Sequence, residues 1–128
     1  MYQRTIARPI SFTGIGLHLG QKVNVTIRPA DVDSGVVFIR TDLPNSLPIK
    51  ADVANVVETK FATTLGQNGI RISTVEHLLA AFMGFGIDNA VVEIDSPEVP
   101  IMDGSASPFV YLLRSAGIKI QKKAKKFL

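Results

Sequence analysis

Two adjacent residues, Glu76 and His77, offer the clearest chemistry in this sequence. A neutral imidazole binds transition metals, and a carboxylate beside it can hold a water molecule on that metal. Both residues fall in the first turn of a predicted helix, whose N-terminal dipole disfavours positive charge and so favours the neutral imidazole. Two structural readings stay open: Glu76 has capping-box spacing from Ser73, and a single histidine on a helix is often an ordinary surface residue.

The sequence contains no complete metal site of a recognisable type. Ala81 occupies the fourth position after His77, so the H-E-x-x-H signature is absent. The other histidine is His18, and the chain has no cysteine. A catalytic zinc ion usually takes three protein ligands and a water molecule, so His77 would need partners that the spacing does not reveal.

A glycine-rich segment, residues 13–18, predicts a sharp turn between two strands. Gly14 and Gly16 lack the third glycine of a dinucleotide-binding fingerprint, and no helix is expected to follow them. Glycines permit the tight backbone of such a turn. The side chains of Leu17 and His18 are then expected to project from its rim.

A second irregular segment, residues 99–106, contains Asp103 and Gly104. It has too few spaced carboxylates for a calcium loop of the EF-hand type. We favour a structural loop in which Asp103 accepts hydrogen bonds from backbone amides, with a calcium or phosphate site as the alternative.

Apolar periodicity predicts the elements that must position these residues. Asn68-Gly69 between two β-like runs is a strong hairpin signal. Pro108 is expected at the first position of a second helix that ends at Gly117. We predict an α+β fold: a two-layer sandwich with a mixed or antiparallel sheet and two helices on one face. The expected strands span residues 6–12, 23–27, 36–39, 49–53, 61–65, 70–72, 90–94 and 118–120, and the expected helices span 74–83 and 107–116.

The first helix is expected to have an unusual outer face. Its apolar stripe should pack on the sheet and consists of Val75, Leu78, Leu79, Phe82 and Met83. The opposite side carries His77, Ala80 and Ala81 and no charge after Glu76. A face of small uncharged residues lets another backbone approach, so we expect a second layer, absent from this chain, to cover it.

Composition indicates one globular domain. The chain has 128 residues, of which 46% are hydrophobic and 20% charged. The absence of cysteine, of a signal peptide and of a membrane span makes the cytoplasm the expected location. The net charge of +3 comes mostly from lysines near the end of the chain, so we expect a domain at 1–121 and a basic tail or linker at 122–128.

Five segments together resemble the N-terminal half of the UDP-3-O-acyl-N-acetylglucosamine deacetylase family. The resemblance runs from about Gln3 to the end of the chain, and the segments occur in register at residues 13–18, 40–43, 73–78, 86–89 and 100–106. It implies a zinc-dependent amide hydrolase of lipid A biosynthesis in Gram-negative bacteria. Such an enzyme removes the N-acetyl group from acylated UDP-glucosamine, at a site between two similar α+β domains.

The resemblance also implies roles for individual residues. His77 would be the one zinc ligand from this half, and Glu76 the general base. The expected substrate contacts are Leu17, His18, Phe61 and Ala62. In the family the remaining zinc ligands, in a His-Lys-x-x-Asp motif, and a further histidine and threonine lie in the second half. A C-terminal domain is therefore the expected partner, and the isolated chain is expected to fold, to bind zinc weakly at most and to be inactive.

Two other classes of function remain open. Small α+β domains with a basic tail also occur as RNA- or phosphate-binding modules, although no nucleic acid is expected under the deacetylase interpretation. Such a module would lose salt-dependent RNA binding when Lys122 to Lys126 are deleted. The alanine face could instead mediate dimerisation, which would make sedimentation depend on concentration.

Overall fold

The computed structural model describes residues 1–60 and 62–126, and it confirms the α+β class. Two α-helices and a short 3₁₀ segment are distributed among the strands of three sheets. In chain order the elements are β1 Tyr2–Ile6, β2 Ile10–Ile15, β3 Lys22–Pro29, β4 Val36–Arg40, β5 Ile49–Lys50, η1 Val53–Asn55, β6 Val56–Glu58, β7 Thr64–Gln67, β8 Ile70–Ser73, α1 Glu76–Phe85, β9 Ala90–Ile94, α2 Ser107–Ala116 and β10 Ile118–Ala124.

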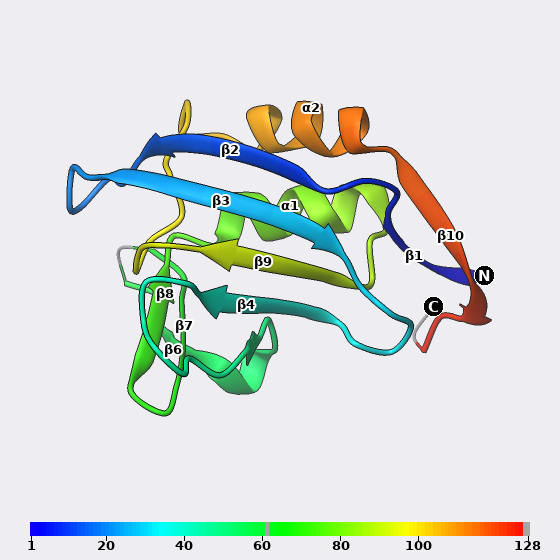
Figure 1. Cartoon of the computed structure of the whole chain (residues 1–128), viewed down its shortest axis with the longest axis horizontal. Coiled ribbons are helices and arrows are strands. Elements are labelled where there is room, and N and C mark those ends of the chain that lie inside the picture. The colour runs from blue at the N-terminus through cyan, green and yellow to red at the C-terminus, as the bar shows by residue number, and fades with distance from the viewer. Residues whose placement is uncertain (61, 127–128) are drawn as a thin grey trace.

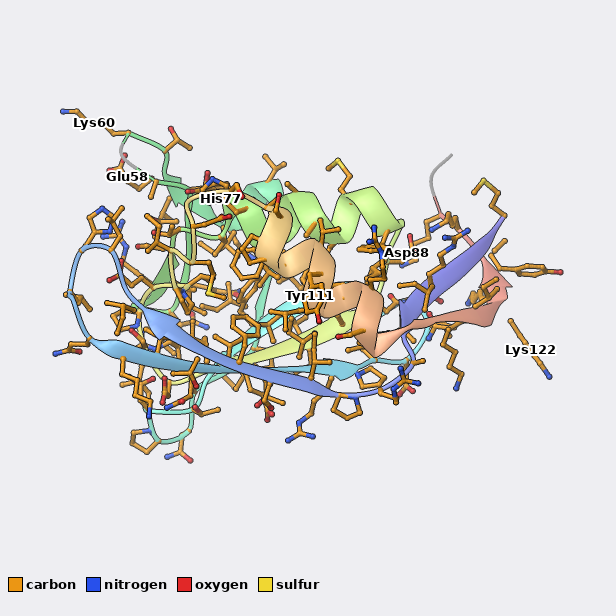
Figure 2. All side chains as sticks on the ribbon, turned by 90° about the horizontal axis from the view of Figure 1, so that it is seen from above. Glu58, Lys60, His77, Asp88, Tyr111 and Lys122 are labelled. Carbon is orange, nitrogen blue, oxygen red and sulfur yellow. The ribbon has the colours of Figure 1, made fainter. Side chains whose placement is uncertain are left out.

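The main sheet has five strands in the order β2-β3-β9-β4-β5. Neighbouring strands are antiparallel except β4 and β9, which are parallel, so the sheet is mixed as predicted. Both helices lie on the same face of this sheet (Figures 1 and 2). They also contact each other, which gives the predicted two-layer arrangement.

The hydrophobic core fills the space between the main sheet and the two helices. Every second residue of β3 from Val23 to Ile27 is buried, as are residues one helical turn apart on each helix. This pattern follows from the two periodicities, because every second strand residue and every third or fourth helix residue faces the same way. The buried positions are Val23, Val25 and Ile27 on β3, Leu78 and Phe82 on α1, and Phe109 and Leu113 on α2.

A three-stranded sheet, β6-β7-β8, lies beside one end of the main sheet (Figure 1). The hairpin predicted around Asn68-Gly69 is confirmed, because Gln67 pairs with Ile70 across a two-residue turn. Both turn residues have positive φ, 56° and 78°, as a type I′ turn requires. The hairpin matters for the site because β8 leads directly toward α1.

Gly69→Ala is expected to destabilise the domain by about 1 kcal/mol, because only the backbone conformation is at issue there. Apart from Gly69 itself and its chain neighbours, no heavy atom of the described residues lies within 4 Å of a Cβ added at Gly69. The matched control is Gly84→Ala, which also meets nothing but lies in α1 with ordinary helical φ. Alanine is the better helix former, so this control should stabilise by about 0.5 kcal/mol. Urea unfolding measures both, and equal signs would contradict the explanation.

Several strands differ from the predicted ones. The expected strand at 61–65 is observed as β7 Thr64–Gln67, residue 61 lying outside the described residues, and β6 Val56–Glu58 was not predicted. The expected strand at 6–12 divides, because Ile6 belongs to β1 and Phe12 to β2, in different sheets. The expected strand at 49–53 stops at Lys50, and Val53 instead begins η1 with its side chain exposed. The Asp52 side chain accepts a hydrogen bond from the Ala54 amide and so favours a turn over further strand pairing.

The start of α1 also differs from the prediction. The helix begins at Glu76, and its N-cap residue, Val75, makes no side-chain cap hydrogen bond. Ser73 is instead the last residue of β8, where its hydroxyl accepts a hydrogen bond from the Thr64 hydroxyl at 3.0 Å. The capping-box interpretation of Ser73 and Glu76 is therefore wrong. The helix runs to Phe85, two residues beyond the expected end at 83, and of the two glycines that could end it, Gly84 and Gly86, the one that does so is Gly86, with φ of 65°.

The outer face of α1 is rotated relative to the predicted one. Ala81 is 1% exposed and belongs to the core, whereas Met83 is 82% exposed. The reason is that α1 packs on α2 as well as on the sheet, which moves the buried arc toward Leu78, Ala81 and Phe82. An uncharged exposed face remains, but it consists of Ala80, Met83 and Gly84.

The C-terminal segment is more ordered than a tail. β10 runs to Ala124 and pairs with β1, so the expected boundary at residue 121 falls inside a strand (Figure 1). Lys123 forms an ion pair with Asp33 at 2.6 Å, and Lys125 forms one with Asp88. Within the described residues, neither helix is long and apolar enough to cross a membrane.

Candidate active site

A strained residue precedes the pair Glu76 and His77. Thr74 is buried, lies between β8 and α1, and has φ of 62°. This left-handed conformation costs a residue other than glycine about 1–2 kcal/mol, and more strongly disfavours a branched side chain. Its hydroxyl has no hydrogen-bond partner among the described residues. Such strain is characteristic of functional sites, and here it turns the chain so that α1 starts with Glu76 and His77.

The Glu76 carboxylate is held in one orientation by the loop that precedes β7. Its Oε2 atom accepts a hydrogen bond from the Thr63 amide at 2.8 Å, and the Val75 amide donates to the Thr63 carbonyl at 3.3 Å. Within the described part of the chain, Oε1 makes no hydrogen bond. A half-buried carboxylate that is fixed by one oxygen and open at the other is suited to accept a proton.

The His77 ring lies at the N-terminal end of α1, half-buried and without a hydrogen bond or ion pair to residues 1–60 or 62–126 (Figure 2). Hydrogen bonds from the Ser105 hydroxyl and amide lower the pKa of Asp103, and the nearby charge of His77 lowers it by a smaller amount. An imidazole that the surrounding protein leaves unpaired can take an external ligand.

The loop at 99–106 has the predicted structural role. Asp103 Oδ1 accepts a hydrogen bond from the Ser105 amide at 2.9 Å, and Gly104 has φ of 81°. Asp103 thus caps one backbone amide of its own loop, that of Ser105. The sequence did not predict that this carboxylate would lie near enough to His77 for the two charges to interact.

The predicted glycine turn joins β2 to β3 and is organised around the carboxylate of Glu98. That carboxylate accepts hydrogen bonds from the amides of His18 and Leu19, at 3.0 and 2.8 Å, and from His18 Nδ1 at 2.9 Å. A Cβ at Gly16 would lie 2.2 Å from Glu98 Oε1. Gly14 lies inside β2, and neither Gly14 nor Gly16 has positive φ, so the explanation from backbone freedom is wrong. Glycine at position 16 instead makes room for the carboxylate.

A cavity of about 470 Å³ adjoins this turn, and it brings His18 and Ala62 together. Glu58, Arg71 and Glu98 are among the other residues that line it. Of the remaining residues expected to contact substrate, Leu17 is exposed and is not among those lining this cavity, and Phe61 lies outside the described residues. Glu76 and His77 are not among the lining residues either, so in the described chain the cavity and the start of α1 are separate features.

Sequence reasoning missed Glu98, which is 2% exposed. The available signal was an acidic residue between Pro97 and Pro100, directly after a buried strand. Because the amides it binds lie 79 and 80 residues earlier in the chain, no local pattern could reveal them.

Burial alone raises the pKa of Glu98, but the hydrogen bonds from the Leu19 amide and from the ring and amide of His18 outweigh it, and the pKa falls below its ordinary 4.5. A lowered folded-state pKa stabilises the fold above the unfolded pKa, and this contribution is lost as the pH falls toward the folded value.

We expect Glu98→Gln to destabilise the domain at pH 7 and the difference in unfolding free energy from the parent to shrink between pH 5 and 3. Urea unfolding across this range measures it, with Glu93→Gln as control. A difference independent of pH would refute the assignment.

The described residues do not complete a metal site by themselves. No group of three or more histidine, cysteine, aspartate or glutamate side chains with suitable geometry occurs within 1–60 and 62–126. The unpaired ring of His77 fits a single ligand position, and zinc in a catalytic site needs more.

The fold and site define a class: an α+β domain that presents an oriented carboxylate and a free imidazole at a strained helix start. The sequence model of the family described as "LpxC: UDP-3-O-acyl N-acetylglycosamine deacetylase" matches residues 3–128. The chain therefore belongs to the UDP-3-O-acyl N-acetylglycosamine deacetylase family.

Several curated relatives carry the name UDP-3-O-acyl-N-acetylglucosamine deacetylase. The chain is 58% identical to the protein of Saccharophagus degradans over 126 residues, which cover 98% of this chain and 42% of that protein. It is 57% identical to the protein of Shewanella baltica over 129 residues, covering 100% and 42%, and 57% identical to that of Alcanivorax borkumensis over 126 residues, covering 98% and 41%. The chain thus spans about two-fifths of the length of these relatives.

Proposed function

We propose that this chain is the N-terminal part of a zinc-dependent deacetylase that removes the N-acetyl group from UDP-3-O-acyl-N-acetylglucosamine in lipid A biosynthesis, in the cytoplasm of a Gram-negative bacterium. The observation that carries the proposal is the start of α1. There Glu76 is held by the Thr63 amide with one carboxylate oxygen open, and the adjacent His77 ring is unpaired within the described chain.

Each residue has a distinct role in this proposal. His77 supplies one ligand to zinc, and Leu17, His18, Phe61 and Ala62 contact the substrate. A bound zinc ion would polarise the acetamide carbonyl and lower the pKa of its water toward ~7. Glu76 accepts the proton of the attacking water at its open oxygen and later returns it to the leaving amine. The hydrogen bond from Thr63 keeps the carboxylate in place during both transfers.

The other zinc ligands are proposed to come from the part of the relatives that this chain does not match. The exposed, uncharged face formed by Ala80, Met83 and Gly84 supports a covering domain, because an ordinary solvent-facing helix carries charged residues there. With one ligand of its own, the 128-residue chain should bind zinc weakly at most and should not turn over substrate.

A chimera tests the proposal. The matching 42% of the Shewanella baltica relative is replaced by this chain, and acetate release from UDP-3-O-acyl-N-acetylglucosamine is measured with zinc supplied. We expect turnover by the chimera and none by the 128-residue chain alone. A folded, zinc-loaded chimera without turnover, beside an active unmodified relative, would reject the proposed activity. Turnover by the isolated chain would reject the need for a second domain.

The alternative of an RNA- or phosphate-binding module receives no support from the basic segment. Lys123 and Lys125 are engaged by Asp33 and Asp88, and Lys126 also lies within 3.8 Å of Asp33. These ion pairs offset part of the positive charge of the segment and tie β10 to the rest of the domain, while the side chains of Lys123 and Lys126 stay 56% and 60% exposed.

A further inference from the structure

We infer that Glu98 is a positioning residue for substrate binding: it fixes the orientation and tautomer of His18, so that Nε2 of the ring is presented to the substrate. The inference rests on the proposed deacetylase function for the identity of that substrate. The Glu98 carboxylate is buried, and it has no role in the proposed reaction or in the expected substrate contacts.

The geometry leaves Glu98 little freedom. Its two oxygens accept from the amides of His18 and Leu19 and from the His18 ring, at distances between 2.8 and 3.1 Å. Gly16 packs so closely on the carboxylate that no side chain fits between them. Charge-assisted hydrogen bonds of this kind are roughly twice as strong as neutral ones, so the turn and the ring are held together.

The backbone of Glu98 connects this turn to the start of α1. Glu98 forms a parallel bridge with Ser73, the Ser73 amide donates to the Pro97 carbonyl at 2.7 Å, and the Val99 amide donates to the Ser73 carbonyl at 2.9 Å. Ser73 precedes Glu76 by three residues, with the constrained Thr74 between them. The position of His18 is thereby set relative to the proposed general base.

The chemistry of the pair determines which ring nitrogen faces a ligand. An ionised carboxylate only accepts hydrogen bonds, so His18 Nδ1 must carry the proton. The opposite nitrogen, Nε2, is left for the cavity of about 470 Å³ that His18 lines. A neutral ring accepts there from a sugar hydroxyl, and a protonated ring donates to a phosphate oxygen. In both cases Nε2 contacts an oxygen of the nucleotide-sugar headgroup.

Glu98→Gln separates this role from simple support of the turn. The glutamine oxygen can still accept from the amides of His18 and Leu19, which leaves the glutamine NH₂ group facing the ring. Since that group donates, Nδ1 must become the acceptor and the proton must move to Nε2.

The first measurement uses the 128-residue chain. Long-range ¹H–¹⁵N correlation spectra at pH 8 report which nitrogen of each imidazole carries the proton. We expect Nδ1–H for His18 in the parent and Nε2–H in Glu98→Gln, with His77 unchanged between the two as an internal control. An Nε2–H tautomer in the parent would overturn the inference.

The second measurement uses the chimera. An interaction that binds the substrate and the transition state equally well affects KM and leaves kcat unchanged. Glu98→Gln should therefore raise KM about tenfold and change kcat by less than about threefold. In a His18→Ala background the same substitution should change KM by less than about twofold, because the group through which Glu98 acts is gone. Glu93→Gln, a half-buried position of β9 paired with Arg28, is the matched control for a lost carboxylate.

The outcomes separate the two hypotheses. An equal effect of Glu98→Gln on KM with and without the His18 ring would overturn the positioning role and leave Glu98 as support for the turn. A parent chimera without deacetylase activity, together with the expected tautomers, would count against the proposed function alone. The wrong tautomer in an active enzyme would count against this inference alone.

Discussion

Replacing Glu76 by glutamine in the zinc-loaded chimera should lower kcat by about 10²–10⁴-fold, because a general base that takes and returns a proton contributes a factor of this size. Glutamine keeps an oxygen that can accept from the Thr63 amide, which the carboxylate binds at 2.8 Å. It cannot accept a proton at neutral pH, so the variant removes the chemistry while keeping the local contact. The measurement is steady-state acetate release, with bound zinc determined on the same samples.

Zinc content and the unfolding midpoint distinguish a loss of general-base catalysis from a loss of metal or of folded protein. Glu76→Gln should retain the zinc stoichiometry and the unfolding midpoint of the parent, whereas His77→Ala should reduce zinc retention as well as turnover. Glu93→Gln, which removes an exposed ion pair with Arg28, should leave kcat within about twofold, because surface substitutions away from special features have small effects. A Glu76→Gln enzyme with more than a tenth of the parent kcat would remove Glu76 from the proposed mechanism.

The sequence predicted the elements around the site well where one local rule decided the outcome. The turn at Asn68-Gly69 and the helix end at Gly86 depend on positive φ values that few residues tolerate. Pro108, the second residue of α2, has a fixed φ that suits the start of a helix. The burial of every second residue of β3 was predictable from the alternating apolar pattern of its sequence, because one face of this strand packs on the core.

Predictions failed where tertiary packing decided between two local possibilities. Ser73 and Glu76 have capping-box spacing, but Ser73 is drawn into β8 by its pairing with Thr64, and Glu76 turns to the Thr63 amide. Ala81 and Met83 exchanged environments because α2 contacts α1, and no property of the α1 sequence shows where its neighbour lies.

The candidate site could be predicted only in part for a related reason. Glu76 and His77 are adjacent in the chain and share one helix turn, so their residue types were enough to suggest them. The contact between Glu98 and His18 joins residues 80 positions apart and exists because the segment after β9 bridges to Ser73. A single sequence contains no local trace of such a contact, whereas the absence of a side chain at Gly16 becomes meaningful once the carboxylate is seen beside it.

The segment 86–89 has a structural role that carries the second large prediction: Asn89→Ala should destabilise the domain by about 3 kcal/mol, because it leaves buried polar groups without partners. Asn89 is 1% exposed. Its Nδ2 donates to Gln3 Oε1 at 2.9 Å and to Gln121 Oε1 at 2.8 Å, and its Oδ1 accepts from the Gly35 amide at 2.9 Å. One side chain thus joins β1, β10 and the start of β4, which local interactions cannot hold together.

Asn24→Ala is the matched control, since the Asn24 side chain is exposed and hydrogen-bonds to Asp95 and Thr13 at the surface. It should cost less than about 1 kcal/mol, because water replaces those exposed partners. Urea unfolding gives both free energies, and amide hydrogen exchange should show lost protection at Gly35 in Asn89→Ala alone. Equal costs for the two variants would mean that β1 and β10 are held by their strand pairing and the Lys125–Asp88 ion pair rather than by the buried amide.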